Sequence, residues 1–229
     1  MIIAAIQKTS LIDFPGEIAT VIFTQGCNFR CPYCHNPELV DSRQYREALD
    51  NREVFAYLEF RKKLIDGVVI TGGEPTLQKD LPEFLKKVKA LGYAVKLDTN
   101  GTNPTMIKKL LKLGLVDYIA MDYKAPLSKY AEVVRSHVNL QAIIESVEII
   151  KKSGIKYEFR TTVVKQLLTP QDIKIIKSEI GRGEKYCIQK FNPTKTLDKN
   201  FMNCKTIAPQ ILQEINDSTE GFFKEEIVR

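Results

Sequence analysis

The chain has 229 residues, of which 44% are hydrophobic and 27% charged, a composition typical of a soluble globular protein with a sizeable core. Its 34 basic and 28 acidic residues give a net charge of +6, and the lysines are scattered through helix-like segments, which argues against nucleic-acid binding. No apolar run reaches the ~18 residues that a membrane span needs, and no signal peptide is evident, so we expect a cytoplasmic protein without a membrane partner.

Strand-like and helix-like segments alternate along the chain. Residues 1–16 are interpreted as a strand rather than a signal peptide. Short runs rich in β-branched and aromatic residues then predict six strands, mostly without the alternation of a half-exposed strand, as expected for parallel strands buried on both faces. These runs cover residues 18–26, 67–73, 93–101, 116–124, 156–164 and 185–192.

Amphipathic helices are predicted between the strands. Asp80 and Glu83 have the spacing of a capping box at one helix start, and Thr169 begins another helix with a proline in its first turn. The predicted helices cover residues 44–64, 80–91, 105–113, 139–153, 169–180 and, packed against the sheet edge, 209–216.

This alternation predicts an α/β fold with a parallel sheet. The pattern does not separate an open doubly wound sheet from a barrel, whole or partial. Because no linker or composition break divides the chain, we expect a single domain over residues 1–229, with a core at about 15–195 and a C-terminal extension at 196–229.

Polar and glycine-rich residues follow the predicted strands. In parallel sheets of this class, ligands bind at the carboxyl ends of the strands, so these residues predict one composite site. They are the cysteine stretch after the first parallel strand, then Thr71–Pro75, Asp98–Gly101, Met121–Lys124, Arg160, Thr162 and Gln189.

Three of the five cysteines, Cys27, Cys31 and Cys34, lie within eight residues at C-x3-C-x2-C spacing. An odd number of cysteines without a disulfide framework indicates metal or redox chemistry. Structural zinc usually takes four protein ligands, whereas three thiolates on a four-iron cluster leave one iron open, as catalytic sites require.

The remaining candidate ligands fit less well. His35 directly follows Cys34, so ligation of one ion by both would be strained. Cys187 or Cys204 would complete a site only if the fold brought one of them close. Cys187 lies within a predicted strand beside an apolar residue and is expected to be buried, while Cys204 receives no role.

The stretch "CNFRCPYC" resembles the signature of the radical S-adenosylmethionine (radical SAM) enzymes, with aromatic Tyr33 before the third cysteine and "GGEP" after the next strand. The resemblance covers roughly residues 10–195. It implies a partial (β/α)6 TIM-like barrel of parallel strands, open on one side. It also implies a [4Fe–4S] cluster held by Cys27, Cys31 and Cys34, whose open iron binds S-adenosylmethionine and cleaves it to a 5′-deoxyadenosyl radical.

The same resemblance implies a set of cofactor-binding residues. Gly72 and Gly73 would let the backbone approach the methionine moiety, and Glu74 would accept a hydrogen bond from its ammonium. The full set is Tyr33, Gly72, Gly73, Glu74, Asp98, Thr99, Asn100, Asp122, Lys124 and Arg160. Plainer readings are a tight turn at "GGEP", a simple loop at "DTNG", a surface ion pair between Asp122 and Lys124, and pairing of Arg160 with Glu158 or another acid.

The longer stretch 8–40 resembles the activases of glycyl radical enzymes, and most of all those of anaerobic ribonucleoside-triphosphate reductase, with pyruvate formate-lyase activating enzyme as a relative. The matching residues are Asp13, Pro15, Gly16, Gln25, Gly26, His35 and Asn36. This implies abstraction of a glycine Cα hydrogen from a partner glycyl radical enzyme, with electrons from a low-potential donor such as flavodoxin or ferredoxin. Asp13 is a candidate contact for the partner's loop.

Two alternatives remain open. The first is a radical SAM enzyme acting on a small molecule, like the 7-carboxy-7-deazaguanine synthases, which also have short chains and "GGEP". The second is a non-catalytic, zinc-stabilised binding protein. An iron–sulfur chromophore would exclude the second, and conversion of a purine precursor would favour the first.

Overall fold

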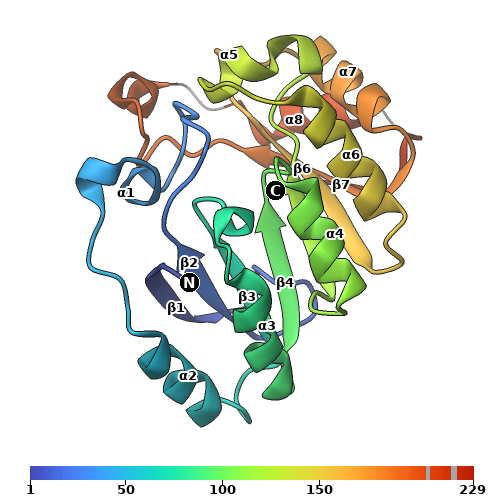
Figure 1. Ribbon diagram of the computed structural model, residues 1–229. Coiled ribbons are helices and arrows are strands. Elements are labelled where there is room, and N and C mark those ends of the chain that lie inside the picture. Colours follow the sequence, from blue (N-terminus) through green and yellow to red (C-terminus); the bar gives the residue numbers. More distant parts are fainter. Residues whose placement is uncertain (205–206, 218–220) are drawn as a thin grey trace.

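A computed structural model describes residues 1–204, 207–217 and 221–229, and it contains one eight-stranded sheet (Figure 1). The strands follow one another in chain order across the sheet. They are β1 (Ile3–Ser10), β2 (Ala19–Thr24), β3 (Gly67–Gly72), β4 (Ala94–Thr99), β5 (Tyr118–Asp122), β6 (Lys156–Val163), β7 (Gly183–Lys190) and β8 (Phe223–Val228).

All six predicted parallel strands are confirmed. β1 pairs with β2 in the antiparallel direction, and every later neighbouring pair is parallel. β8 is a seventh parallel strand that the sequence analysis did not predict. Within the described residues the two edge strands β1 and β8 do not pair, so the sheet is a barrel open on one side, as expected.

Helices cover the outer face of the sheet, with α3, α4 and α6 side by side in Figure 1. The helices are α1 (Pro37–Val40), α2 (Asn51–Phe60), α3 (Leu81–Ala90), α4 (Pro104–Lys112), α5 (Tyr130–Val134), α6 (Leu140–Lys151), α7 (Pro170–Ile180) and α8 (Pro209–Asp217). No helix in these described residues is long and apolar enough to cross a membrane.

The predicted helix over 44–64 is wrong at its start. Only Asn51–Phe60 is helical, because Asp50 caps the backbone N–H of Arg52 at 2.8 Å and fixes the first turn there. Before the cap, the chain crosses to the first strand, where the N–H of Leu49 donates to the carbonyl of Ile3 at 2.9 Å. Backbone pairing with β1 therefore replaces helix in this segment.

The helix starts predicted at Asp80 and Thr169 differ in how they are capped, and the predicted capping box at Asp80 is wrong. At Thr169 a capping box forms, since the hydroxyl accepts from the N–H of Asp172 and the Asp172 carboxylate accepts from the N–H of Thr169. At Asp80 it does not form, because this carboxylate instead pairs with the amino group of Met1. Glu83 forms an ion pair with Lys86 at 2.8 Å rather than accepting a hydrogen bond from the N–H of Asp80.

The core has two parts, one on each face of the sheet. Alternate strand residues such as Ile22 and Ile70 belong to the larger part, which also contains the buried helix residues. The intervening strand residues, such as Val21 and Val69, form a small cluster on the concave face. In it the ring of Phe14 packs edge-on against that of Tyr118, with 6.0 Å between the ring centroids. Phe14 thus closes the concave face near the amino ends of the strands and leaves the carboxyl ends open.

Candidate active site

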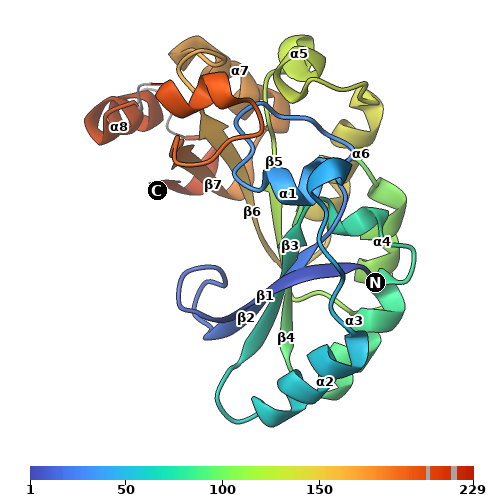
Figure 2. The ribbon, with the colours of Figure 1, turned by 90° about the vertical axis from the view of Figure 1, so that its left-hand side faces the viewer.

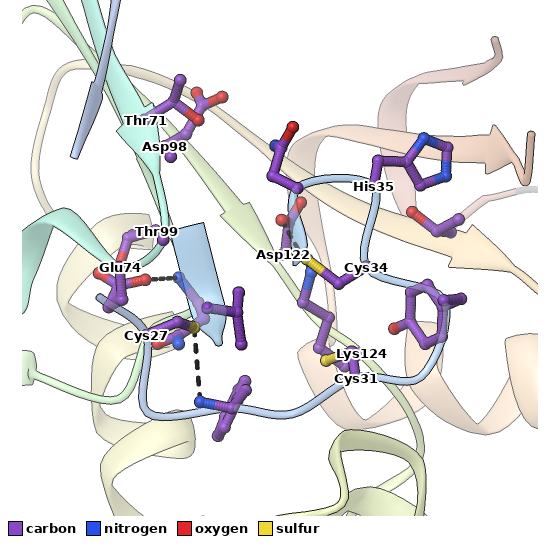
Figure 3. A pocket seen from close by; sticks show the side chains of 18 residues that line it. Cys27, Cys31, Cys34, His35, Thr71, Glu74, Asp98, Thr99, Asp122 and Lys124 are labelled. Carbon is purple, nitrogen blue, oxygen red and sulfur yellow. Dashed lines mark hydrogen bonds and ion pairs between the residues drawn. The ribbon is translucent and has the colours of Figure 1, made fainter. Parts of the chain in front are cut away.

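A cavity of about 200 Å³ lies at the carboxyl ends of the strands and is bordered by the cysteine loop (Figure 3). Of the predicted residues, Gln189 and Arg160 do not line it, whereas the cluster cysteines and the other predicted cofactor-binding residues do. These are Cys27, Cys31, Cys34, Tyr33, Gly72, Gly73, Glu74, Asp98, Thr99, Asn100, Asp122 and Lys124. The residues that line this site therefore come from four successive strands, β2 to β5, and from the loops that follow them.

The three thiols of the loop are free and lie largely out of solvent. Burial raises the pKa of Cys27 to about 12 and that of Cys31 to about 11, and it also raises the pKa of Cys34. Such thiols are inert as nucleophiles at neutral pH, because they stay protonated unless a cation replaces the proton. The donor set suits a metal centre rather than thiol catalysis.

Short backbone contacts hold the loop in place. The N–H of Phe29 donates to the Cys27 sulfur at 3.4 Å, and the N–H of Cys34 donates to the carbonyl of Cys31 at 3.0 Å. The Arg30 guanidinium donates to the carbonyl oxygens of Cys27 and Phe29 at 2.7 and 2.8 Å. These contacts fix where the thiols of Cys27 and Cys34 lie.

Gly72 and Gly73 are required by the protein's own backbone. A Cβ on Gly72 would lie 2.4 Å from the nitrogen of Thr24, and one on Gly73 would lie 2.0 Å from the carbonyl oxygen of Gly26. Gly72 also has a φ of +117°, a conformation that favours glycine. The two glycines let the end of β3 pass directly against the start of the cysteine loop.

The Glu74 side chain is buried, with 1% of its surface exposed, and it links the ends of β3 and β4 through hydrogen bonds. Its carboxylate accepts from the N–H and hydroxyl of Thr76, from the hydroxyl of Thr99 at 2.7 Å and from the N–H of Asn100 at 2.7 Å. Burial raises the pKa of Glu74, while these hydrogen bonds oppose the rise. The carboxylate faces the cavity with most of its acceptor capacity already used.

A partly buried network of five charged side chains forms one wall. Arg160 donates to Asp122 at 2.8 Å and to Asp98 at 3.2 Å, and Lys124 donates to Asp122 at 2.9 Å, while Lys96 pairs with Asp98. Arg160 does not line the cavity, because it lies behind these two carboxylates. The plainer reading of Asp122 and Lys124 as a surface pair is wrong, because both side chains are partly buried. The plainer reading of Arg160 holds in part, since Arg160 pairs with acids other than Glu158.

This network carries three positive and two negative charges, so its net charge is +1. Burial by itself raises the pKa of Asp122, but Arg160 and Lys124 outweigh it and hold that pKa below its usual range. Asp98 shows the same balance. Both carboxylates are therefore ionised at neutral pH, and the excess positive charge favours an anionic group in the cavity.

Residues after β7 pack over the cysteine loop, and the sequence analysis missed this. The ring of Phe191 lies edge-on to Tyr33 at 6.3 Å and to His35 at 5.6 Å. The N–H of Asp198 donates to the carbonyl of Pro32 at 2.9 Å. The available signal was Phe191 itself, a large apolar residue at the end of the predicted strand over 185–192, where the cavity was expected. Phe29 and Val40 also line the cavity without having been predicted.

The prediction that Asp13 contacts a partner's loop over the cluster is wrong in its placement. Asp13 lies in the hairpin between β1 and β2, before β2 begins, whereas Cys27 follows the end of β2 (Figure 2). Its carboxylate accepts from Ser10 at 2.5 Å and shapes the turn. Cys187 is fully buried, as predicted, and neither it nor Cys204 lines the cavity.

Comparison with known proteins shows the family of this chain. The family model of the radical SAM superfamily matches residues 21–176. A protein of Methanocaldococcus jannaschii, provisionally named a glycyl-radical enzyme activating enzyme, is 33% identical over all of this chain and 95% of its own length. The pyruvate formate-lyase-activating enzyme of Listeria monocytogenes is 36% identical over 52% of each chain.

Among solved structures, SuiB of Streptococcus suis bound to its precursor peptide SuiA superposes with a TM-score of 0.68. The match covers 90% of this chain and 48% of SuiB at 15% identity. At this identity the likeness concerns the fold alone, and it agrees with the open, mostly parallel sheet.

Proposed function

We propose that this chain abstracts a hydrogen atom from a glycine Cα of a partner glycyl radical enzyme. The chain belongs to the radical SAM superfamily, and within it to the glycyl-radical-enzyme activating enzymes. The observation that carries the proposal is that three free thiols share one cavity with a partly buried, net positive network. Membership in the superfamily implies an iron–sulfur cluster and S-adenosylmethionine.

We propose a [4Fe–4S] cluster on Cys27, Cys31 and Cys34. The three thiols come from one loop and line a shared cavity. Structural zinc usually takes four protein ligands, whereas three thiolates on a four-iron cluster leave one iron open, which favours the cluster over zinc. With S-adenosylmethionine bound, such a cluster supplies one-electron cleavage of the sulfonium and a 5′-deoxyadenosyl radical.

The protein's own residues would bind and orient the cofactor. Lys124, on the network with excess positive charge, would attract the carboxylate of the methionine moiety, and Arg160 supports it from behind through Asp122. Thr99 and Asn100 would contribute further polar contacts at the end of β4. Gly72, Gly73 and Tyr33 line the cavity as the remaining members of the proposed cofactor set, together with Glu74 and Asp98.

We propose anaerobic ribonucleoside-triphosphate reductase as the partner, with flavodoxin or ferredoxin as the electron donor, in the cytoplasm. The relatives named as activating enzymes support the reaction class, and the open side of the sheet supports a macromolecular substrate. The continuous sheet from β1 to β8 supports a single domain over residues 1–229.

The first test compares Cys31→Ala with Cys187→Ala after anaerobic reconstitution. Both remove a buried thiol, but only Cys31 lines the cavity. We expect the Cys31 variant to fold and to lose both the iron–sulfur chromophore and production of 5′-deoxyadenosine, and the Cys187 variant to keep both. Full cofactor cleavage by the Cys31 variant would contradict the proposed site, whereas conversion of a purine precursor by the native chain would replace the partner protein with a small molecule.

A further inference from the structure

The side chains of Asn28, Asn100 and Thr102 form a closed ring of hydrogen bonds. The Asn100 amide nitrogen donates to the amide oxygen of Asn28 at 2.9 Å, and the Asn28 nitrogen donates to the hydroxyl of Thr102 at 3.0 Å. The ring closes where this hydroxyl donates to the amide oxygen of Asn100 at 2.7 Å. It joins the cysteine loop, in which Asn28 follows Cys27, to the turn that follows β4.

One backbone group fixes the direction of every bond in this ring. The N–H of Thr102 donates to the amide oxygen of Asn100 at 3.0 Å, and an N–H cannot act as an acceptor. The Asn100 nitrogen must therefore point toward Asn28, and the Asn28 oxygen must meet it. If either amide were turned over, two donors would face each other.

Of these three residues, only Asn100 lines the cavity. Its amide oxygen accepts from both the N–H and the hydroxyl of Thr102, so both of its lone pairs are used. Its amide nitrogen carries two hydrogens, of which the ring uses one. The Asn100 side chain can therefore still present a donor to a ligand, but no acceptor.

We propose that Asn28 is a positioning residue for the cofactor. Through the ring it holds the Asn100 amide as a hydrogen-bond donor to an acceptor group of S-adenosylmethionine, such as a hydroxyl or carboxylate oxygen. The ammonium of the methionine moiety only donates, so another group has to bind it. The inference rests on the proposed use of S-adenosylmethionine, but not on the identity of the partner protein.

Two substitutions open the ring, and each has a matched control. Asn28→Ala removes the acceptor of the Asn100 nitrogen. Its control, Asn203→Ala, removes another exposed asparagine, which lies in the 3-10 helix η4 (Lys199–Asn203) and does not line the cavity. Thr102→Val removes the bridging hydroxyl, whereas its control, Thr102→Ser, keeps it.

The first measurement needs no cofactor. Urea unfolding of the apoproteins gives a double-mutant cycle between Asn28→Ala and Thr102→Val. Because either substitution opens the ring, the stability loss in the double variant should be smaller than the sum of the two single losses. Additive losses would mean that the ring does not act as a unit, and they would overturn the inference.

The second measurement is the Kd for S-adenosylmethionine of the reconstituted proteins by isothermal titration calorimetry, with iron content, KM and kcat for its cleavage alongside. A misplaced amide loses one neutral hydrogen bond, which typically corresponds to a factor of about 3–10 in Kd. Asn28→Ala and Thr102→Val should raise Kd and KM by about this factor at unchanged iron content and kcat. Thr102→Ser and Asn203→Ala should retain the Kd of the unsubstituted protein.

A role confined to holding the cysteine loop would have a different signature. The iron content of Asn28→Ala would fall, while the Kd of the protein that still carries a cluster would not change. That result would overturn the inference, and cleavage of S-adenosylmethionine by the unsubstituted protein would leave the proposed function intact. If the unsubstituted protein takes up no cluster and binds no S-adenosylmethionine, both the inference and the proposed function fail.

Discussion

Replacing Gly73 by alanine should displace the cysteine loop. The new Cβ would lie 2.0 Å from the oxygen and 2.6 Å from the carbonyl carbon of Gly26, the residue before Cys27. Non-bonded contacts settle near ~3.5–4.0 Å, so one backbone segment must move by roughly 1.5 Å. Neither neighbour is the end of a flexible side chain, so no rotamer change relieves the overlap.

The cost follows from the clash and from the hydrogen bonds at this crossing. Overpacking typically costs about 1–3 kcal/mol, and movement here also strains the bonds from Gly73 N–H to Thr24 and from Glu74 N–H to Gly26, at 2.9 and 2.7 Å. Each such bond is worth about 1 kcal/mol, so we expect a loss of about 3 kcal/mol in the free energy of unfolding. Cluster content should fall with it, because Cys27 is displaced.

Urea unfolding of the apoprotein and the iron and sulfide content after reconstitution measure both effects. Gly114→Ala is the matched control, since its Cβ has no heavy atom within 4 Å and only its φ of +62° opposes the change. That strain should cost about 1 kcal/mol and leave cluster content unchanged. Equal stability losses in the two variants, with full iron in both, would refute the reasoning.

Three further predictions concern the charged wall and the segment over the loop. Arg160→Leu should lower the free energy of unfolding by about 3 kcal/mol in urea titrations, because it leaves Asp98 and Asp122 each with a single cationic partner. Since the pKa of Asp122 is held below its unfolded value, its stabilisation is fully present above pH ~5 and is lost as pH falls through the folded pKa. Apoprotein unfolding measured from pH 7 to pH 3 should therefore show stability falling with acid, and less steeply in Arg160→Leu. Phe191→Ala should cost about 3 kcal/mol and speed iron loss to a chelator, because the ring packs against Tyr33 and His35.

Each of these has a contradicting result. If Arg160→Leu were as stable as the unsubstituted protein, the Arg160 guanidinium would not be needed to stabilise the carboxylates of Asp98 and Asp122. A stability that rises on acidification would reverse the sign argued for Asp122. Chelation of iron at an unchanged rate in Phe191→Ala would show that the segment after β7 does not hold the cysteine loop.

The sequence predicted the parallel strands because each is a short apolar run, and it predicted the site because polar residues follow those runs. β8 escaped prediction because Glu225 and Glu226 interrupt its apolar residues. Lys185 and Lys177 neutralise these glutamates, and both lysines are far away in sequence. Pairings between distant charges of this kind leave no local pattern.

The same limit applies within the site. The four donors around Glu74 come from two different strand ends, and the packing of Phe191 on Tyr33 joins segments more than 150 residues apart. The error at Asp13 has a different cause. Asp13 was assigned to the partner contact because its turn belongs to the activase-like stretch 8–40, although strand β2 separates that turn from the cysteines.

The most direct test of the account is anaerobic electron paramagnetic resonance on the reconstituted, reduced protein mixed with S-adenosylmethionine and the anaerobic ribonucleotide reductase of the same organism. The account predicts a glycine-centred doublet on the reductase that is absent without S-adenosylmethionine and absent with Cys31→Ala. Cleavage of S-adenosylmethionine to 5′-deoxyadenosine without any glycyl signal would contradict the proposed partner, and a protein that neither binds iron nor cleaves the cofactor would contradict the central claim.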